Sequence, residues 1–378
     1  MLFACTQENL AQGLGMVAHV TGKNINLPVL GNVLFKTENG NLKLSTTNLE
    51  IAVSCSVRGK VESDGEYSVP AKLLLDYVSL LPTGKIELEL KEEGLEVRTS
   101  DQHTVIRGLA ANEFPLLPKL NKESNFQLPA ESLKAALNQV TFAASTSESR
   151  PELTGVACFF KPEGNGWAAI FAATDSYRLA EKKLMINSGS GEVRKAIVPA
   201  RSMLEIARIV SSYKDDISGP SDVAWSFGEN QLMVTYGNVE LVTRLIEGSF
   251  PPYQEIIPQT FKTEAVLPRT ELSKAVRAAS LFARQGLFDV HLTLDPDQGL
   301  CTIASADQGT GNTKTNIKGD VKGIKNEITL NFRYLNDGLG AMGTEKVKLS
   351  MINDGSPVLI LPESTPEQYR YLVMPIRQ

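Results

Sequence analysis

The chain has 378 residues, of which 42% are hydrophobic and 21% are charged, and its formal net charge is −5. This length predicts two or three domains that each bury a core, and the composition is ordinary for a soluble globular protein. The negative balance argues against a protein that coats nucleic acid by bulk attraction. Any contact with nucleic acid therefore has to come from locally basic surface.

No stretch of the sequence approaches the ~20 apolar residues that a membrane-spanning helix needs. The N-terminal sequence MLFACTQENL also lacks the basic start and continuous apolar run of a secretory signal. We therefore expect a cytoplasmic protein with no membrane partner.

The first third of the chain predicts a helix, then a strand that leads into a second helix, and then a hairpin. Residues 7–20 (QENLAQGLGMVAHV) and 68–82 (SVPAKLLLDYVSLLP) place apolar side chains at i, i+3 and i+4, the spacing of one helix face. Residues 94–117 alternate apolar and polar side chains around a polar loop and close on Phe114-Pro115. Such alternation predicts two antiparallel strands.

The middle third of the chain repeats these three blocks. Residues 129–143 (PAESLKAALNQVTFA) predict the first helix, and residues 197–210 (IVPARSMLEIARIV) predict the strand and second helix. Residues 230–257 alternate in the same way as the first hairpin and contain Phe250-Pro251.

The last third of the chain carries the blocks once more. Residues 268–283 (PRTELSKAVRAASLFA) predict a helix, and residues 330–342 (LNFRYLNDGLGAM) predict a strand followed by a helix. Residues 346–363 form the third hairpin pattern, with Asp354-Gly355 as its turn signal.

Three block types in the same order, three times, indicate a protein built from three repeats of about 120 residues. The pattern pauses in residues 118–125 and 257–263, so we expect domains at 1–122, 123–257 and 258–378. The expected fold class is α+β, with two helices packed on antiparallel sheets in each domain. Chance similarity among ordinary α+β segments is the alternative interpretation.

The sequence lacks the common signatures of an enzyme, so we expect no catalytic residues. Its histidines stand in neither HExxH nor HxH spacing, which favours structural or exposed roles over a metal site; they are His19, His103 and His291. No GxSxG motif occurs, and GTGNTKT (309–315) fails the phosphate-loop spacing and predicts a polar turn. Asp175 and Glu181 are weak candidates for an acid and a base.

The cysteines are far apart and form no CxxC pair, which predicts buried thiols and neither a zinc site nor a disulfide framework. They are Cys5, Cys55, Cys158 and Cys301.

Three further stretches carry a resemblance to a known family: LPVLGNVLF (27–35), AATDSYRLA (172–180) and YLVMPIRQ (371–378). With the repeats, they make the chain resemble the bacterial sliding clamps, the DNA polymerase III beta subunits, over essentially its full length. The resemblance implies three clamp domains of like fold, each a pair of βαβββ halves, that form half of a ring. It also implies a homodimer of six domains, without catalytic activity or cofactor, that encircles duplex DNA as a processivity factor in replication.

The resemblance also implies the partners. They are duplex DNA bound without sequence preference, a second copy of the chain, the DNA polymerase III alpha subunit, the clamp loader and other proteins with a clamp-binding motif. The alternative is a repeat-built scaffold that binds proteins without encircling DNA. Retention on circular DNA that is lost on linearisation would separate the two.

Basic side chains lie on or beside the predicted helices and could attract phosphates while the rest of the surface repels them. Phosphate contacts carry no sequence information, so such a ring could slide. The DNA-binding candidates are Lys23, Lys72, Lys134, Arg150, Arg201 and Arg284. By position, Lys23, Arg150 and Arg201 match family DNA sites best, and a solvated helix face is the alternative for each.

The resemblance implies a cleft for client peptides between the second and third domains, with apolar walls for burial and with Arg178 and Arg377 to orient the backbone or an acidic flank of the peptide. The matching positions are Leu153, Thr174, Ser176, Tyr177, Arg178, Leu179, Pro251, Ile256, Tyr334, Leu372, Met374, Pro375, Ile376 and Arg377. Family members often have Gly-His in place of Ser176-Tyr177 and Arg in place of Glu255. The positions that match the dimer interface are Ile106, Leu281 and Phe282.

Overall fold

The computed structural model describes residues 1–22, 27–38, 40–116, 120, 124–186, 188–190, 192–213 and 220–376. Within these residues the chain builds the same series of elements three times. Each series consists of a strand, a helix, five strands, a second helix and three final strands. The predicted threefold repetition is therefore confirmed.

The six α-helices of the described residues occupy two equivalent places in each repeat. They are α1 Gln7–Val17, α2 Ala71–Leu80, α3 Ala130–Val140, α4 Ala200–Ser212, α5 Arg269–Ser280 and α6 Phe332–Ala341. All six were predicted from apolar spacing, and α4 continues two residues beyond its predicted end. The Thr6 side chain caps α1 by accepting from the Asn9 N–H, and Asn331 caps α6 by accepting from the Arg333 N–H.

One compact unit comprises Met1–Lys134, Ile186–Glu192 and Arg201–Leu245 and holds two antiparallel sheets. The smaller sheet has, in spatial order, β5 Lys60–Ser63, β1 Leu2–Thr6, β7 Lys85–Lys91, β8 Gly94–Arg98 and β9 His103–Ile106. The larger has β14 Ser188–Ser190, β10 Ser124–Pro129, β16 Asp222–Phe227, β17 Gln231–Tyr236, β18 Val239–Arg244, β4 Ile51–Val57, β3 Asn41–Thr47, β2 Asn32–Glu38 and β6 Glu66–Pro70.

The other compact unit comprises Ala135–Met185, Val193–Ala200 and Ile246–Gln378. Its larger sheet has β15 Arg194–Pro199, β11 Gly155–Glu163, β12 Gly166–Thr174, β13 Arg178–Ile186, β27 Tyr369–Val373, β26 Val358–Pro362, β25 Lys346–Met351, β19 Thr263–Pro268 and β23 Asp320–Gly323. Its smaller sheet has β22 Gly311–Lys318, β21 Leu300–Asp307, β20 Asp289–Asp295 and β24 Asn326–Asn331.

Each nine-stranded sheet joins two successive repeats. In one, the last strand of the second repeat, β18, pairs with β4 of the first, and Leu241 lies opposite Val53. In the other, the last strand of the third repeat, β27, pairs with β13 of the second, and Leu372 lies opposite Leu179. The equivalent strands at the two ends of the series are β9 and β22, and each of them is one of the two outer strands of its smaller sheet.

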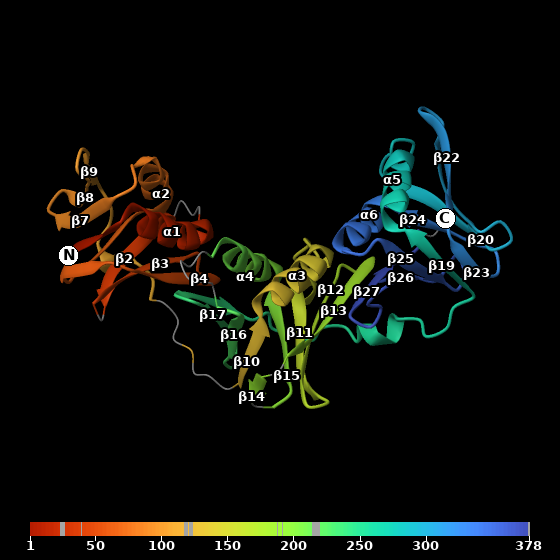
Figure 1. Cartoon of the computed structure of the whole chain (residues 1–378), viewed down its shortest axis with the longest axis horizontal. Helices are drawn as coiled ribbons and strands as arrows, with labels where there is room; N and C mark the ends of the chain where they lie inside the picture. The colour runs from red at the N-terminus through yellow and green to blue at the C-terminus, as the bar shows by residue number, and fades with distance from the viewer. Residues whose placement is uncertain are drawn as a thin grey trace. The chain divides into compact units, whose positions relative to one another are not determined.

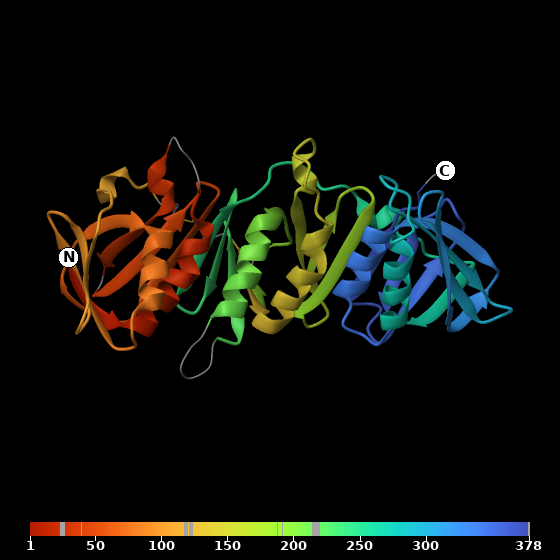
Figure 2. The ribbon, with the colours of Figure 1, turned by 90° about the horizontal axis from the view of Figure 1, so that it is seen from above.

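Helices pack in pairs against the sheets, as α1 with α2 and α5 with α6 (Figure 1). Figure 2 shows the members of each pair running side by side. The buried positions of α1 include Leu10, Leu14 and Val17, which follow the predicted apolar spacing. Close packing explains a helical glycine: a Cβ at Gly338 in α6 would lie 2.1 Å from the Tyr371 ring on β27.

The predicted polar turn over residues 309–315 is wrong for most of its length. The Asp307 carboxylate accepts from the Gly309 and Thr310 N–H groups and closes a short turn, after which β22 begins at Gly311. The sequence looked like a loop because β22 is an outer strand and keeps polar side chains on both faces. Most of the expected pause at 118–125 lies outside the described residues.

Candidate functional site

A pocket of about 240 Å³ opens where the ends of β12, β13 and β27 meet residues 251–256. Its lining consists of Arg150, Leu153, Thr174, Ser176, Arg178, Leu179, Pro251, Pro252, Tyr253, Glu255, Ile256, Leu372 and Met374. Most of these residues were predicted for the client cleft. Segments that are far apart in the sequence, such as those of Thr174 and Met374, thus form one concave surface.

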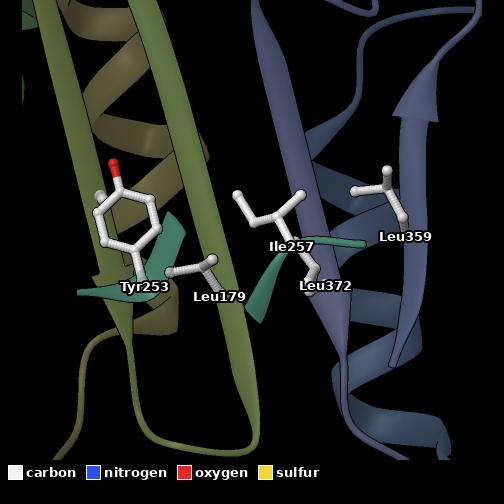
Figure 3. Close-up of a cluster of buried hydrophobic side chains, with 6 residues drawn as sticks. Leu179, Tyr253, Ile257, Leu359 and Leu372 are labelled. Carbon is white, nitrogen blue, oxygen red and sulfur yellow. The ribbon is translucent and has the colours of Figure 1, made fainter. Parts of the chain in front are cut away.

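The floor of the pocket is a buried apolar cluster. Leu179 on β13 lies directly opposite Leu372 on β27, which in turn lies opposite Leu359 on β26. Tyr253 and Ile257 pack over the same face, as Figure 3 shows. These five side chains are at most 6% exposed, so the floor is a packed part of the domain core.

A partly buried hydrogen bond holds Tyr253 in this floor. Its hydroxyl donates to the Glu181 carboxylate across 2.6 Å. Burial, with the nearby Glu181 charge, raises the pKa of the Tyr253 hydroxyl. Asp175 and Glu181, the weak candidates for an acid and a base, therefore form separate structural contacts. Glu181 accepts a hydrogen bond from Tyr253, and Asp175 forms an ion pair with Arg178 across 3.1 Å.

Contacts within the chain hold the side chain of Arg178 in place. Its guanidinium forms ion pairs with Asp175 and Asp337 and donates to the Phe142 carbonyl across 2.8 Å. It also lies 4.7 Å from the centre of the Tyr334 ring. Burial by itself would lower the pKa of Arg178, but Tyr371 and the two carboxylates raise it. Arg178 is thus a cation whose charge is already balanced at the pocket wall.

The other predicted cleft residues flank the pocket. Tyr177 is 62% exposed and stacks on Tyr334, with 6.4 Å between the ring centres. The segment after β27 is anchored by backbone hydrogen bonds of 2.9 Å, from the Met374 N–H to the Tyr177 carbonyl and from the Ile376 N–H to the Thr329 carbonyl. Pro375 lies between these two anchors, and Arg377 lies outside the described residues.

Four lining residues were absent from the set expected for the cleft: Arg150, Pro252, Tyr253 and Glu255, of which Glu255 had been noted only as a departure from the family pattern. Arg150 was predicted to bind DNA; here it pairs with Glu152 across 2.9 Å. The signal for the others was the continuation of the Phe-Pro motif, because Pro252 to Ile256 follow Pro251 directly and form the short helix η6 Tyr253–Ile256.

The candidate DNA-binding residues lie on several elements, and some of them form ion pairs within the chain whereas others do not. Lys72 on α2 and Arg201 on α4 are exposed and form no ion pair with the described residues. The other described candidates face carboxylates of their own chain: Lys134 lies 2.5 Å from Glu131, Arg150 2.9 Å from Glu152 and Arg284 2.5 Å from Asp289. Lys23 lies outside the described residues.

The dimer candidates differ in exposure. Leu281, just after α5, is 74% exposed, whereas Phe282 is half-buried. Ile106 on β9 is only 4% exposed, because its side chain points into the core of its own domain. Successive strand residues point to opposite faces, so the exposed apolar side chain at this edge is Val105, which is 37% exposed. Ile106 is thus buried in the single chain, and its place at the dimer interface stays a prediction.

The cysteines are all buried and free, as predicted. Burial raises the pKa of Cys5, Cys55 and Cys301 to about 12 and that of Cys158 well above its usual range, so all four remain thiols at neutral pH.

Each histidine lies next to a glutamate. His19 is 2.9 Å from Glu205, His103 contacts Glu96, and His291 is 3.4 Å from Glu327. Over the described part of the chain, no three His, Cys, Asp or Glu residues gather as metal ligands. No helix in those residues has the length and apolarity to cross a membrane.

The fold and the pocket define a protein of three like α+β domains joined through continuous sheets. Three models of one family match the chain: the N-terminal domain of the DNA polymerase III beta subunit over residues 1–118, its central domain over 127–252 and its C-terminal domain over 254–377. The chain therefore belongs to the DNA polymerase III beta subunit family.

Curated relatives and solved structures agree with this family assignment. The beta sliding clamp of Synechococcus elongatus is 31% identical over 381 residues, which cover 100% of this chain and 99% of that protein. The sliding clamp of Pseudomonas aeruginosa, solved with a ligand, superposes with a TM-score of 0.92 at 27% identity and 100% coverage of both chains. The Bacillus subtilis sliding clamp has a TM-score of 0.91 at 26% identity, covering 100% of this chain and 99% of that one.

Proposed function

We propose that the chain is the subunit of a DNA sliding clamp. Two copies form a ring around duplex DNA in the cytoplasm, bind it without sequence preference, and hold the replicative polymerase and other clients for processive synthesis. The chain catalyses no reaction itself and needs no cofactor. Its domains are 1–122, 123–257 and 258–378, and one chain supplies half of the ring.

The observation that carries this proposal is the order of strands at the domain junctions. At both junctions within the chain, the last strand of one repeat pairs with the third strand after the first helix of the preceding repeat: β18 pairs with β4, and β27 pairs with β13. The same rule applied to the end repeats pairs β9 with β22. Both are outer strands with unpaired backbone groups, which favour such an addition. Two copies related by a twofold axis satisfy both seams and close the ring.

Side chains support the same seam. The sixth residue of each second helix is acidic, and at both internal junctions it pairs with the preceding repeat: Glu205 lies 2.9 Å from His19, and Asp337 pairs with Arg178. Asp76 holds this place in α2 and has no ion pair with any described residue. A basic side chain on a second copy of the chain would give Asp76 the ion pair that Glu205 and Asp337 have at the internal junctions. Leu281, 74% exposed, supplies apolar surface near α5.

Contact with DNA is supported by the local charge. Lys72 and Arg201 are exposed on the second helices of the first two repeats and have no ion pair with the described residues. A net charge of −5 means that attraction to phosphates is confined to such places. Topological linkage, and not tight binding, would then keep the ring on the duplex.

The client site is the pocket at β13 and β27. Its packed apolar floor and half-exposed rim suit a short peptide with apolar anchor residues. The clients in this proposal are the DNA polymerase III alpha subunit, the clamp loader and other proteins with a clamp-binding motif.

The decisive experiment is loading onto DNA. The purified chain is first sized by sedimentation and then incubated with nicked circular DNA, a clamp loader and ATP. A sliding clamp sediments as a dimer, co-elutes with the circle and is released when the circle is linearised. A protein-binding scaffold would bind peptides equally well but would never be retained, and that result would reject the encircling function.

A further inference from the structure

Glu255 places an unbalanced carboxylate on the rim of the pocket. It lies in η6, next to Ile256, and both residues line the pocket. Glu255 is exposed, and its side chain forms no ion pair or hydrogen bond with the described residues. Its carboxylate is therefore free to meet a bound partner.

The cations of the pocket do not offset this charge. The two lining arginines already face carboxylates of their own chain: Arg150 faces Glu152 across 2.9 Å, and Arg178 faces both Asp175 and Asp337. The carboxylates of Glu152, Asp175 and Asp337 thus already outnumber the two guanidinium groups, and Glu255 adds a fourth negative charge. The described rim consequently carries an excess of negative charge beside an apolar floor.

We propose that this pocket selects client peptides that carry a lysine or arginine next to their apolar anchor residues, and that Glu255 is the residue that recognises this positive charge. The inference rests on the proposed function, since it assumes that clients dock in this pocket. The apolar anchors fill the floor over Leu179 and Leu372, while the basic side chain reaches the half-exposed Ile256 edge, where Glu255 lies.

Physical chemistry limits the size of the effect. A charge pair at a solvated rim contributes a modest share of affinity and acts mainly on partner choice and association rate. We expect a basic flank to bind about two- to five-fold more tightly than an acidic one at low salt, the range typical of exposed pairs. Salt should reduce this ratio, because the pair is exposed to solvent.

The test uses the full chain and three synthetic peptides with the same Leu-Phe anchor. One is flanked by two lysines, one by two glutamates and one by two glutamines. Affinities are measured by fluorescence anisotropy at low and high salt for the unaltered chain, Glu255→Gln and Glu255→Lys. The matched control is Glu363→Gln, which alters an exposed carboxylate after β26 that does not line the pocket.

We expect the lysine peptide to bind most tightly to the unaltered chain and to Glu363→Gln. Glu255→Gln should remove most of the preference, and Glu255→Lys should reverse it, while the glutamine peptide binds all four proteins equally. If the glutamine peptide binds but the charge preference is missing or survives Glu255→Gln, this inference is overturned and the client pocket stands. If none of the three peptides binds, the client pocket fails as well.

Discussion

The guanidinium of Arg208 on α4 donates a 2.6 Å hydrogen bond to the carbonyl of Met16 in the last turn of α1. A second bond of 3.1 Å reaches the Gly15 carbonyl. These carbonyls are among those that a helix end leaves without an intrahelical partner. Arg178 likewise donates to the Phe142 carbonyl just after α3, but both residues lie in the second repeat. Arg208 thus ties a helix end of the first repeat to the second, whereas Arg178 ties a helix end to β13 of its own repeat.

Loss of Arg208 should destabilise the junction between the first two repeats. Arg208→Leu leaves Glu205, which is 5% exposed, without its guanidinium partner, and it leaves two helix-end carbonyls unpaired. Removing one partner of a buried charge pair typically lowers the free energy of unfolding by about 2 to 4 kcal/mol. Urea denaturation measures the loss.

The double variant Glu205→Leu/Arg208→Leu is the control, because it removes the buried charge together with its partner. It should recover part of the stability lost by Arg208→Leu. Equal stability of Arg208→Leu and the unaltered chain would contradict a structural role for this contact.

Acid should weaken the smaller sheet of the first repeat through Glu96. The hydrogen bond from Lys91 and the one from His103 lower the pKa of Glu96 from 4.5 to about 2. Because the folded pKa is depressed, Glu96 stabilises the fold above pH 4.5, and this contribution is lost as the pH falls toward 2.

Thermal melting between pH 6 and pH 2 tests this expectation at intervals of about half a unit, a fraction of the expected shift. Glu96→Gln should have a lower Tm at pH 6 and a smaller decline toward pH 2 than the unaltered chain. Glu93→Gln, in the exposed turn between β7 and β8, is the matched control and should follow the unaltered curve. Parallel curves for Glu96→Gln and the unaltered chain would contradict the assignment.

Leu281→Lys should weaken the dimer. The side chain is 74% exposed in the single chain, so the change introduces a charge at the proposed seam without disturbing the core. Sedimentation velocity at micromolar concentration should find mostly monomer. Leu204→Lys, at a residue of α4 that is 53% exposed, is the matched control and should remain dimeric. A dimer in both variants would place the seam elsewhere.

Ser176 should resist replacement by a branched residue. Its φ is +78°, in the left-handed region, and Leu49 at the equivalent turn has φ +77°. A β-branched residue is strained there, so Ser176→Val should lower the free energy of unfolding by about 1 to 3 kcal/mol. Ser176→Gly should change it by less than about 1 kcal/mol, because glycine adopts this conformation freely. Equal stabilities for the valine and glycine variants would contradict the strain.

Deletion of residues 374–378 should abolish binding of client peptides without dissociating the dimer. The deletion removes Met374 from the pocket wall and the backbone anchors at Tyr177 and Thr329. Peptide anisotropy and sedimentation on the same sample measure both properties. Undiminished peptide affinity would reject the pocket as the client site, whereas a monomer would mean that the C-terminal segment also supports the seam.

The sequence by itself determined the repeat, the helices and the class of fold. Apolar spacing of 3.6 residues located all six helices, because this period is a local property of the chain. Alternation located the hairpins that end the first two repeats, but in the third repeat it located β25 and β26 rather than the final pair of β26 and β27. Residues matched by family resemblance, among them Leu179, Leu372 and Met374, do meet in one pocket.

Tertiary structure decided how exposed each side chain is and whether its charge is neutralised by an ion-pair partner. Ile106 and Val105 look alike in sequence, but the pleat buries one and exposes the other. Arg178 is balanced by Asp337, which lies 159 residues away, whereas Glu255 has no described partner. These outcomes depend on the register of strands distant in sequence, such as β13 with β27, and no local pattern encodes that register.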